Sequence, residues 1–269
     1  MQHSPLVTIG IPVFNGGKTI LKTMTSVLEQ TLPDFEVLIC DDGSTDDTVQ
    51  LIRGLQDSRI QLLQDGTNRG IAYRLNQLID QASAPYFVRM DADDVMFPER
   101  LEKQVRYLQD HPEVDVVGSS AVVIDENDQP IGRRGGILRT WHMDDLFMSA
   151  RFIHPTVAGK TAWFKTWRYD EKLSGCEDMD LWIRSFKQSQ FADIPEPLLY
   201  YRESLTFRLP TYLKRQRLLL QYAWSHLKRM DHRRSILPVT GKIVISSAAA
   251  IVLHALGWDE IMIRRRNQG

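Results

Sequence analysis

The first 110 residues alternate between two hydrophobic periods, and this alternation limits the possible folds more than any other feature. Short apolar, β-branched runs predict strands, whereas apolar residues at helical spacing predict helices. The predicted strands cover 6–14, 35–40, 60–63 and 85–90, and the predicted helices cover 18–30, 48–55, 71–81 and 98–109. Such alternation builds a mostly parallel sheet with helices on both faces. We therefore predict an α/β fold.

Three polar clusters follow predicted strands directly. They read FNGG at 14–17, DDGSTDD at 41–47 and DADD at 91–94. In open α/β sheets, ligands bind outside the carboxyl ends of the strands. Because the three clusters share that edge, we expect them to form one site. Ser44 or Thr45 is also expected to cap the helix that follows the second cluster.

The DADD cluster places Asp91, Asp93 and Asp94 within four residues. Three carboxylates repel one another unless a cation or hydrogen-bond donors compensate. Oxygen ligands of this kind suit Mg²⁺ or Mn²⁺, and the alternative is a solvated acidic loop. Arg89, in the preceding strand, is either a partner of these carboxylates or a diphosphate contact. Asp42 either accepts hydrogen bonds from a base or ribose, or belongs only to a turn and helix cap.

Two further segments carry candidate site residues. Glu177 and Asp178 lie at the start of a helix predicted over 178–187, where a carboxylate serves as a cap or as a general base. Spacing alone favours the cap, and the lone His154 is more often structural than catalytic. Neither G-x-G-x-x-G, nor a P-loop, nor G-x-S-x-G, nor a zinc-ligand cluster is present, which argues against those classes of site.

Composition excludes several classes of protein. Apolar residues make up 43% and charged residues 25%, as in ordinary globular chains. Two cysteines exclude a disulfide scaffold. The first residues show no secretory signal, so we expect a cytosolic setting. Residues 114–124 predict one or two strands, and 125–136 predict a polar, glycine-rich loop.

The end of the chain differs from the rest in charge. From Arg208 onward there are 12 Lys and Arg against three Asp and Glu. A helix is predicted over 212–230, and an apolar run of 16 residues follows at 243–258. The run is shorter than a membrane span requires, so we expect an interfacial helix near anionic headgroups. The alternative is packing on the body of the protein or on a second subunit. We predict two parts, 1–207 and a helical tail over 208–269.

Together these motifs resemble the family 2 inverting glycosyltransferases of the GT-A fold. The resemblance covers about residues 5–205 and rests on six motifs in the family's order. They are IPVFN at 11–15, SVLEQ at 26–30, DDGSTD at 41–46, RMDADD at 89–94, HPT at 154–156 and EDMDLW at 177–182.

The resemblance implies roles for individual residues. A nucleoside would be held by Pro12, Val13, Phe14, Asn15 and Asp42, with Arg89, Asp91, Ala92 and Asp93 completing the nucleotide-sugar site. Asp93, with Asp91, would hold Mn²⁺ or Mg²⁺. Asp178 would be the general base that deprotonates the acceptor hydroxyl. Glu177, His154 and Arg202 are weaker candidates for acceptor or phosphate contacts.

The implied activity is transfer of one sugar from a UDP-, dTDP- or GDP-sugar, with inversion, in cell-surface polysaccharide synthesis. Processive synthases of the family carry Q-x-x-R-W, and that spacing is missing around Gln216–Trp224. The acceptor would be lipid-linked or a saccharide, and a lipid-linked acceptor would explain a basic tail at the inner face of the cell membrane. No nucleic-acid partner is expected. The alternatives are a sugar-phosphate nucleotidyltransferase and a catalytically silent nucleotide-sugar binding protein.

Overall fold

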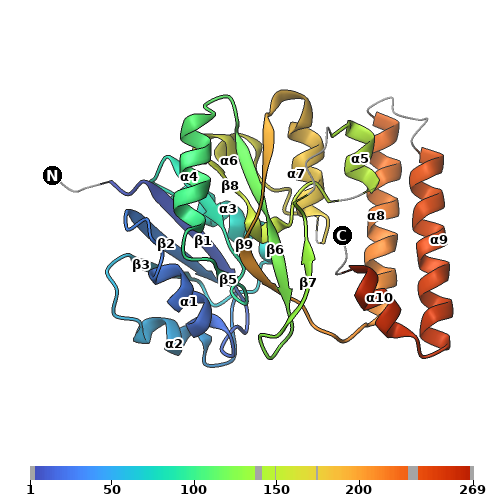
Figure 1. The fold of residues 1–269 in the computed structure, drawn as a ribbon, viewed down its shortest axis with the longest axis horizontal. Coiled ribbons are helices and arrows are strands. Elements are labelled where there is room, and N and C mark those ends of the chain that lie inside the picture. Colours follow the sequence, from blue (N-terminus) through green and yellow to red (C-terminus); the bar gives the residue numbers. More distant parts are fainter. Residues whose placement is uncertain (1–3, 137–140, 149, 174, 230–235, 267–269) are drawn as a thin grey trace.

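The computed structural model describes residues 4–136, 141–148, 150–173, 175–229 and 236–266 (Figure 1). Its strands are β1 (Val7–Val13), β2 (Phe35–Asp41), β3 (Ile60–Gln64), β4 (Tyr86–Arg89), β5 (Val95–Met96), β6 (Val116–Ile124), β7 (Pro130–Arg134), β8 (Ala158–Lys160) and β9 (Phe191–Arg202). Its α-helices are α1 (Ile20–Leu28), α2 (Thr48–Gly54), α3 (Ile71–Gln81), α4 (Arg100–Asp110), α5 (Met143–Met148), α6 (Thr161–Trp167), α7 (Glu177–Ser185), α8 (Leu209–Arg229), α9 (Ile236–Ala255) and α10 (Asp259–Arg266).

The strands form one mixed sheet in the order β3-β2-β1-β4-β8-β6-β9-β5, with β7 paired to β6. The half built from β3, β2, β1 and β4 is parallel, as the alternation of strands and helices predicts. Beyond β4 the pairing is mostly antiparallel, although β6 and β9 run parallel. The carboxyl ends of β1, β2 and β4 therefore meet at one edge, as expected.

Helices cover both faces of this sheet. On one face, α1 and α4 pack Met24 and Leu101 against Ile9 and Ile39. On the other face, α3, α6 and α7 pack against side chains such as Phe87. Trp182 of α7 lies in this second layer and is fully buried. The burial of large apolar side chains on both faces is what fixes the strand ends at the edge where the polar clusters lie.

The structure corrects two local predictions and adds the strands β5, β8 and β9, which were not predicted. Neither Ser44 nor Thr45 caps α2, because Asp47 occupies the cap position and the Asp46 carboxylate accepts the Thr48 amide hydrogen bond at 3.1 Å. The loop predicted over 125–136 contains β7, which pairs with β6. Strand β9 pairs along the whole of β6 but escaped prediction, since two prolines and several charged residues interrupt its apolar pattern.

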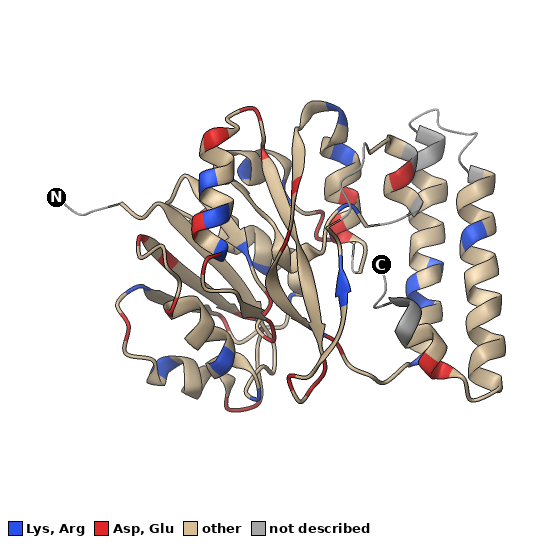
Figure 2. Ribbon diagram, viewed as in Figure 1, with Lys and Arg blue, Asp and Glu red and all other residues tan. Residues whose placement is uncertain are grey.

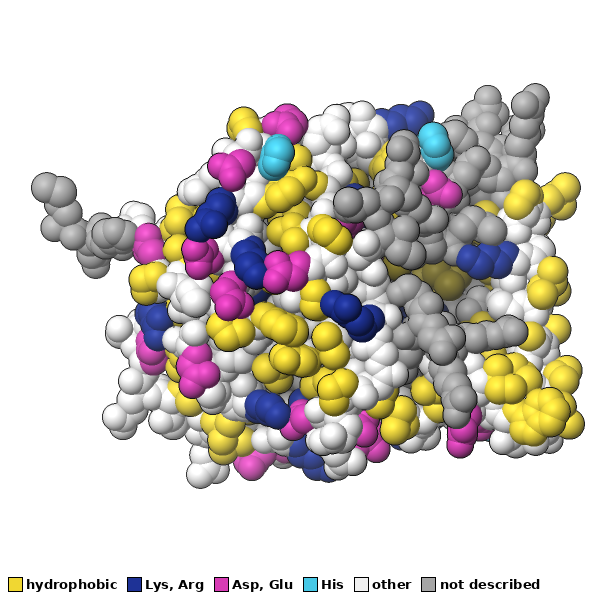
Figure 3. Space-filling model, in the orientation of Figure 1, with side chains coloured by type: hydrophobic (Ala, Val, Ile, Leu, Met, Phe, Trp, Pro, Cys, Tyr) yellow, Lys and Arg dark blue, Asp and Glu magenta, His cyan; other side chains and the backbone are white. Residues whose placement is uncertain are grey.

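The helical tail packs on the body through a third apolar cluster. Tyr222 of α8 and Ile243 of α9 are buried against Phe147 of α5 and Ile183 of α7. The outer surface of α9 is apolar and exposed, with Ile245 71% accessible, and Figure 3 shows hydrophobic side chains gathered at that end of the molecule. Lys242 is the single charged residue of α9 (Figure 2).

The length of α9 differs from the sequence prediction. The apolar run predicted only a segment too short to span a membrane, but the helix starts seven residues earlier. Residues Leu237–Ala255 are long and apolar enough to cross a membrane, judged by length and composition only. The same helix also buries one side against the body, so these criteria do not by themselves distinguish a span from a packed helix.

Candidate active site

The loops after β1 and β2 are bound to each other at the edge of the sheet. The Asn15 amide donates to the Ser44 hydroxyl at 2.8 Å, and the Thr45 amide donates to Asn15 Oδ1 at 2.8 Å. These bonds hold Asn15 in a left-handed conformation, with φ 51°, that non-glycine residues seldom adopt. Pro12 and Val13 are buried in β1, whereas Phe14 and Asn15 are exposed. Of the predicted nucleoside segment, only its last two residues therefore reach the surface.

Asp42 is anchored by a second set of bonds. Its carboxylate accepts from the backbone amides of Arg69 at 2.7 Å and Gly70 at 3.0 Å. The Arg74 Nε also donates to it at 2.8 Å. Arg74 is fully buried and further contacts Asp65 and Gln77. The Asp42 side chain is thus fixed in place and leaves about a tenth of its surface to solvent.

Arg74 was not among the site residues that the sequence predicted. This arginine lies in α3 within the sequence IAYRLN, and no local pattern marks it as a site residue. In the structure Arg74 holds Asp42 and Asp65 rather than facing a ligand. Its role is therefore to position the loop after β2.

The acidic cluster after β4 is drawn together more tightly than a solvated loop would be. Ligand atoms of Asp91, Asp93 and Asp94 all lie within 4.8 Å of one another. Arg89 is buried and contacts both oxygens of Asp91, with Nη1 at 2.8 Å and Nη2 at 2.6 Å. Arg89 is thus a partner of the acidic cluster, one of its two predicted roles. Thr23 also donates to the carbonyls of Ala92 and Asp94, which fixes the loop.

The electrostatics of this cluster fit a divalent cation. Desolvation by the surrounding protein and the negative charge of Asp91 raise the pKa of Asp93 to about 6. The Asp93 side chain is nevertheless exposed to solvent. Burial and the same neighbours raise the pKa of Asp94 well above its usual value. The Asp94 Oδ2 atom is buried and has no hydrogen-bond partner among the residues that the structure describes. A cation would supply the compensating charge that the three carboxylates lack.

Arg202, at the end of β9, clamps this loop from the other side. Its amide donates to Asp94 Oδ1, its Nε to the Asp93 carbonyl and its Nη1 to the Asp125 carbonyl, each at 2.8 Å. Its Nη2 pairs with Asp128. Each nitrogen of the Arg202 guanidinium group therefore contacts a protein oxygen. To contact an acceptor or a phosphate, Arg202 would have to share or give up one of these three hydrogen-bond partners.

His154 lies behind the cluster in a short 3₁₀ turn (His154–Thr156). Burial and the charge of Arg89 hold the pKa of His154 well below its usual value, so the ring is neutral at pH 7. Its Nε2 bonds to the Tyr169 hydroxyl at 2.8 Å. Burial raises the pKa of Tyr169, and the charges of Asp178 and Asp91 act on it in the same direction. The acidic cluster and the start of α7 therefore lie close enough to act on one hydroxyl.

Glu177 and Asp178 occupy the first turn of α7. Glu177 accepts the Gly175 amide at 2.6 Å, and burial together with the charge of Asp178 raises the pKa of Glu177. Asp178 Oδ1 accepts the Met179 amide at 2.8 Å. Both carboxylates thus bond to nearby backbone amides, whereas the N-cap residue of α7 is Cys176. Among the residues that the structure describes, the second oxygen of Asp178 accepts no hydrogen bond, which leaves it for another partner.

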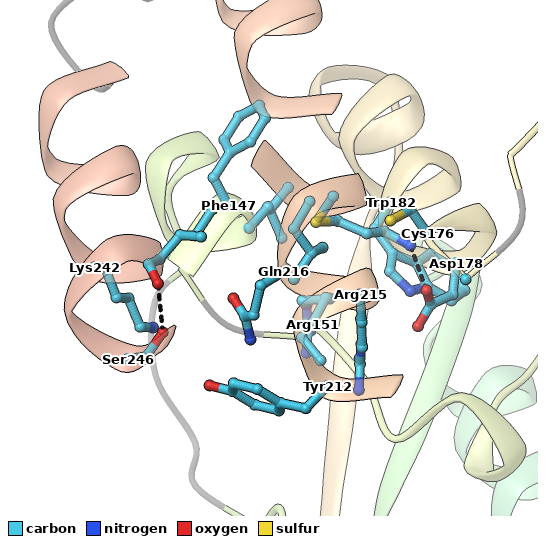
Figure 4. Close-up of a pocket in the computed structure, with 16 residues that line it drawn as sticks. Phe147, Arg151, Cys176, Asp178, Trp182, Tyr212, Arg215, Gln216, Lys242 and Ser246 are labelled. Atoms are coloured by element: carbon cyan, nitrogen blue, oxygen red, sulfur yellow. Dashed lines mark hydrogen bonds between the residues drawn. The ribbon is translucent and has the colours of Figure 1, made fainter. Parts of the chain in front are cut away.

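Asp178 also lines a cavity of about 320 Å³ between α7 and the helices α5, α8 and α9 (Figure 4). Trp182 lines the cavity on the α7 side, and Tyr212, Arg215 and Gln216 line it on the α8 side. Sequence reasoning did not place these three residues in the site, although their spacing puts them on one side of a helix. The tail therefore supplies one wall of the cavity that contains the predicted general base.

Comparison with known sequences identifies the family. The model of glycosyl transferase family 2 matches residues 8–170, which is more than half of the chain. EpsE of Bacillus subtilis is 32% identical over 196 residues, covering 70% of this chain and 69% of EpsE. WfgD of Escherichia coli, a UDP-Glc:alpha-D-GlcNAc-diphosphoundecaprenol beta-1,3-glucosyltransferase, is 37% identical over 100 residues, covering 37% of this chain and 40% of WfgD.

Solved structures share the fold. Staphylococcus aureus TarS 1–349 with UDP matches with a TM-score of 0.63 at 21% identity, over 80% of this chain and 64% of that one, slightly under two thirds. The mannosyltransferase PcManGT of Pyrobaculum calidifontis, in complex with GDP-Man and Mn²⁺, matches with a TM-score of 0.63 at 19% identity, over 95% of this chain and 80% of that one. The predicted GT-A fold is thereby confirmed. With the family model and EpsE in agreement, this chain belongs to glycosyltransferase family 2.

Proposed function

We propose that this glycosyltransferase is an inverting, divalent-metal-dependent enzyme that moves one sugar from a nucleotide-diphosphate sugar to a lipid-linked acceptor. The observation that carries the proposal is the pairing of two carboxylate sites. Asp91, Asp93 and Asp94 gather after β4, and Asp178 lines a cavity close by. Metal-assisted departure of a nucleoside diphosphate and deprotonation of an acceptor need carboxylates at two such places.

The donor would lie across the ends of β1, β2 and β4. Asp42 would face the base, the exposed Phe14 and Asn15 would flank the nucleoside, and Arg89 would hold the acidic cluster in position for the diphosphate. UDP and GDP-Man in TarS and PcManGT support a nucleotide sugar as donor. We include UDP-, dTDP- and GDP-sugars in this class.

In the proposed reaction Asp178 takes the proton of the acceptor hydroxyl. The oxygen then forms a bond to the anomeric carbon while the bond to the nucleoside diphosphate breaks, which inverts that carbon in a single displacement. Glu177, which lies beside Asp178, and His154, which lies behind the acidic cluster, would orient the acceptor. No covalent nucleophile is required.

The metal would be held by Asp93, with Asp91 beside it. Mn²⁺ or Mg²⁺ supplies positive charge that stabilises the departing diphosphate. The buried, unpartnered Asp94 oxygen and the raised pKa of Asp93 support a cation at this position. Arg89 and Arg202 would keep the three carboxylates in place, since each contacts this loop directly.

The acceptor and location form the remaining part of the proposal. We place the protein in the cytoplasm at the inner face of the membrane, in cell-surface polysaccharide synthesis, with 1–207 as the transferase domain and 208–269 as a membrane-associated tail. The exposed apolar surface of α9 supports this, as does the relative WfgD, whose name specifies an acceptor on diphosphoundecaprenol.

The test is turnover of a panel of UDP-, dTDP- and GDP-sugars with Mn²⁺ and with EDTA, read as nucleoside diphosphate released. Asp93→Asn is compared with Asp110→Asn, a matched change at the exposed end of α4. We expect nucleoside diphosphate release to require the metal and to be lost in Asp93→Asn but not in Asp110→Asn. NMR should show that the configuration of the anomeric carbon is inverted in the product. Release that survives EDTA refutes the metal role. Pyrophosphate formed from a nucleoside triphosphate and a sugar phosphate would indicate a nucleotidyltransferase, and binding without turnover a silent protein.

A further inference from the structure

The cavity between α7 and the tail has walls of two kinds. Apolar side chains such as Phe147 and Ile243 line one part. Cations line another part, with Arg215 from α8 and Lys242 from α9, and Asp178 lies on the α7 side. A cavity of about 320 Å³ is large enough for part of a ligand but not for a nucleotide sugar as well.

Arg215 is distinctive among these cations. In the part of the chain that the structure describes, Arg215 makes no hydrogen bond and no ion pair, whereas Arg151 in the same cavity pairs with Asp193 at 2.6 Å. The Arg215 side chain lines the same cavity as Cys176 and Asp178 at the start of α7. An arginine without a partner beside a cavity is a candidate for binding an anionic group of a ligand.

A second cavity, of about 520 Å³, shares two lining residues of α8 with the first. Tyr212 and Arg215 line both cavities, and the second also has Arg208, Phe207 and Met262 in its walls. Arg215 therefore borders both cavities. An elongated acceptor that occupied both would pass this cation partway along its length.

We infer that Arg215 binds the phosphate or diphosphate that links the acceptor sugar to its lipid carrier. The inference rests on the proposed function, because it assigns a substrate class to the acceptor side of that same site. Asp178 and Arg215 line one cavity. One acceptor molecule would therefore place its sugar hydroxyl at Asp178 and its phosphate at Arg215. The bidentate geometry of a guanidinium group matches phosphate oxygens, and the apolar walls accommodate the first part of a prenyl chain.

The experiment uses farnesyl diphosphate as probe, with farnesol and inorganic pyrophosphate as controls, by calorimetry on the full chain. EDTA is present so that the diphosphate is not held through a metal at the acidic cluster. Arg215→Gln is compared with Arg217→Gln, which removes the same charge from an exposed position of α8 that lines neither cavity. Far-UV circular dichroism and thermal unfolding establish that each variant is folded.

We expect farnesyl diphosphate to bind the wild type and Arg217→Gln alike, and Arg215→Gln about 10- to 100-fold more weakly, the range of a charge-assisted hydrogen bond pair. Farnesol should bind all three proteins equally. Release of nucleoside diphosphate from the donor to water, without acceptor, should be unchanged in Arg217→Gln, which lines neither cavity. Binding to anionic vesicles should be unchanged in Arg215→Gln, since the exposed surface of α9 is intact.

Several results would overturn the inference. An equal loss of farnesyl diphosphate affinity in Arg215→Gln and Arg217→Gln would show that the overall positive charge of α8, and not Arg215 itself, causes the effect. Failure of the wild type to bind farnesyl diphosphate would remove the lipid-linked acceptor. Metal-dependent donor turnover in the same preparation would still support the metal-dependent transferase part of the proposed function. Pyrophosphate binding as tightly as farnesyl diphosphate would assign Arg215 to the donor. Loss of vesicle binding in Arg215→Gln would assign it to lipid headgroups.

Discussion

Replacing Arg74 by methionine tests whether a buried cation organises the nucleotide side of the site. The change keeps the apolar stem of the side chain and removes the guanidinium group. In the structure that group donates to Asp42 at 2.8 Å and to Gln77 at 2.9 Å, and it also binds Asp65 and the Thr67 carbonyl. The variant therefore leaves buried acceptors without their donor.

The size of the effect follows from burial. Removing one member of a buried ion pair costs about 3–5 kcal/mol of the free energy of unfolding, because the remaining charge is left uncompensated. Arg74 is fully buried and Asp42 nearly so, but the Asp65 side chain is one third exposed. Solvent screens the Asp65 contact, so we expect a loss of about 3–4 kcal/mol. We also expect nucleotide affinity to fall about tenfold, because Asp42 loses one charge-assisted bond.

Urea unfolding gives the stability change, and calorimetry with UDP or GDP gives the affinity at a temperature where the variant is folded. Arg69→Met is the matched control. Its side chain pairs with Asp65 on the surface, and its backbone amide, which binds Asp42, is kept. The control should lose less than about 1 kcal/mol. Equal losses in the two variants, or unchanged nucleotide affinity in a destabilised Arg74→Met, would refute the reasoning.

The other predictions concern catalysis, metal, the tail and the membrane. Asp178→Asn should lower sugar transfer about 10²–10⁴-fold with donor affinity unchanged, measured by steady-state kinetics. Asp93→Ala should abolish Mn²⁺-dependent nucleotide binding in calorimetry, because it removes the proposed metal ligand. Tyr222→Phe should lose about 1.5–3 kcal/mol in urea unfolding, since its buried hydroxyl donates to a carboxylate. Ile245→Glu should reduce sedimentation with anionic vesicles relative to Leu21→Glu, a matched change on α1.

Contrary results would reassign these residues. Near-normal transfer by Asp178→Asn would make Asp178 a helix cap and Glu177 the next candidate base. Metal-dependent binding retained by Asp93→Ala would place the metal elsewhere. Unchanged stability of Tyr222→Phe would show that its hydrogen bond to Asp180 contributes no net stability. Equal vesicle binding by Ile245→Glu and Leu21→Glu would make α9 a packing or oligomer surface.

The parallel half of the fold could be predicted because its pattern is local. Each strand is a short apolar run that ends in polar residues, so the edge that gathers Asp42 and Asp93 follows from the connection rules alone. The antiparallel half gave weaker signals. Strand β9 contains Pro195 and Pro197, and its register on β6 shifts at Ser120, so no regular alternation marks it in the sequence.

The site was only partly predictable, for a related reason. The acidic cluster could be found since its three carboxylates are close in sequence. The contacts that hold this cluster and Asp42 in place could not be found, because Arg202 reaches Asp94 across 108 residues and Arg74 reaches Asp42 across 32. The cavity beside Asp178 depends on how α8 and α9 pack on α7, and helical spacing gives the faces of these helices but not their partners.

The packing of the tail also determines which experiment can test its membrane role. Deleting residues 240–269 would remove Ile243, which is buried against α5 and α7, and would expose apolar surface on the body. Such a protein would bind membranes or aggregate for reasons unrelated to the native tail. Ile245 lies on the outer surface and is 71% exposed, so a charge there leaves the packed side of α9 intact. Loss of vesicle binding in Ile245→Glu, with unfolding and donor turnover unchanged, would therefore report on the native outer surface of α9 itself.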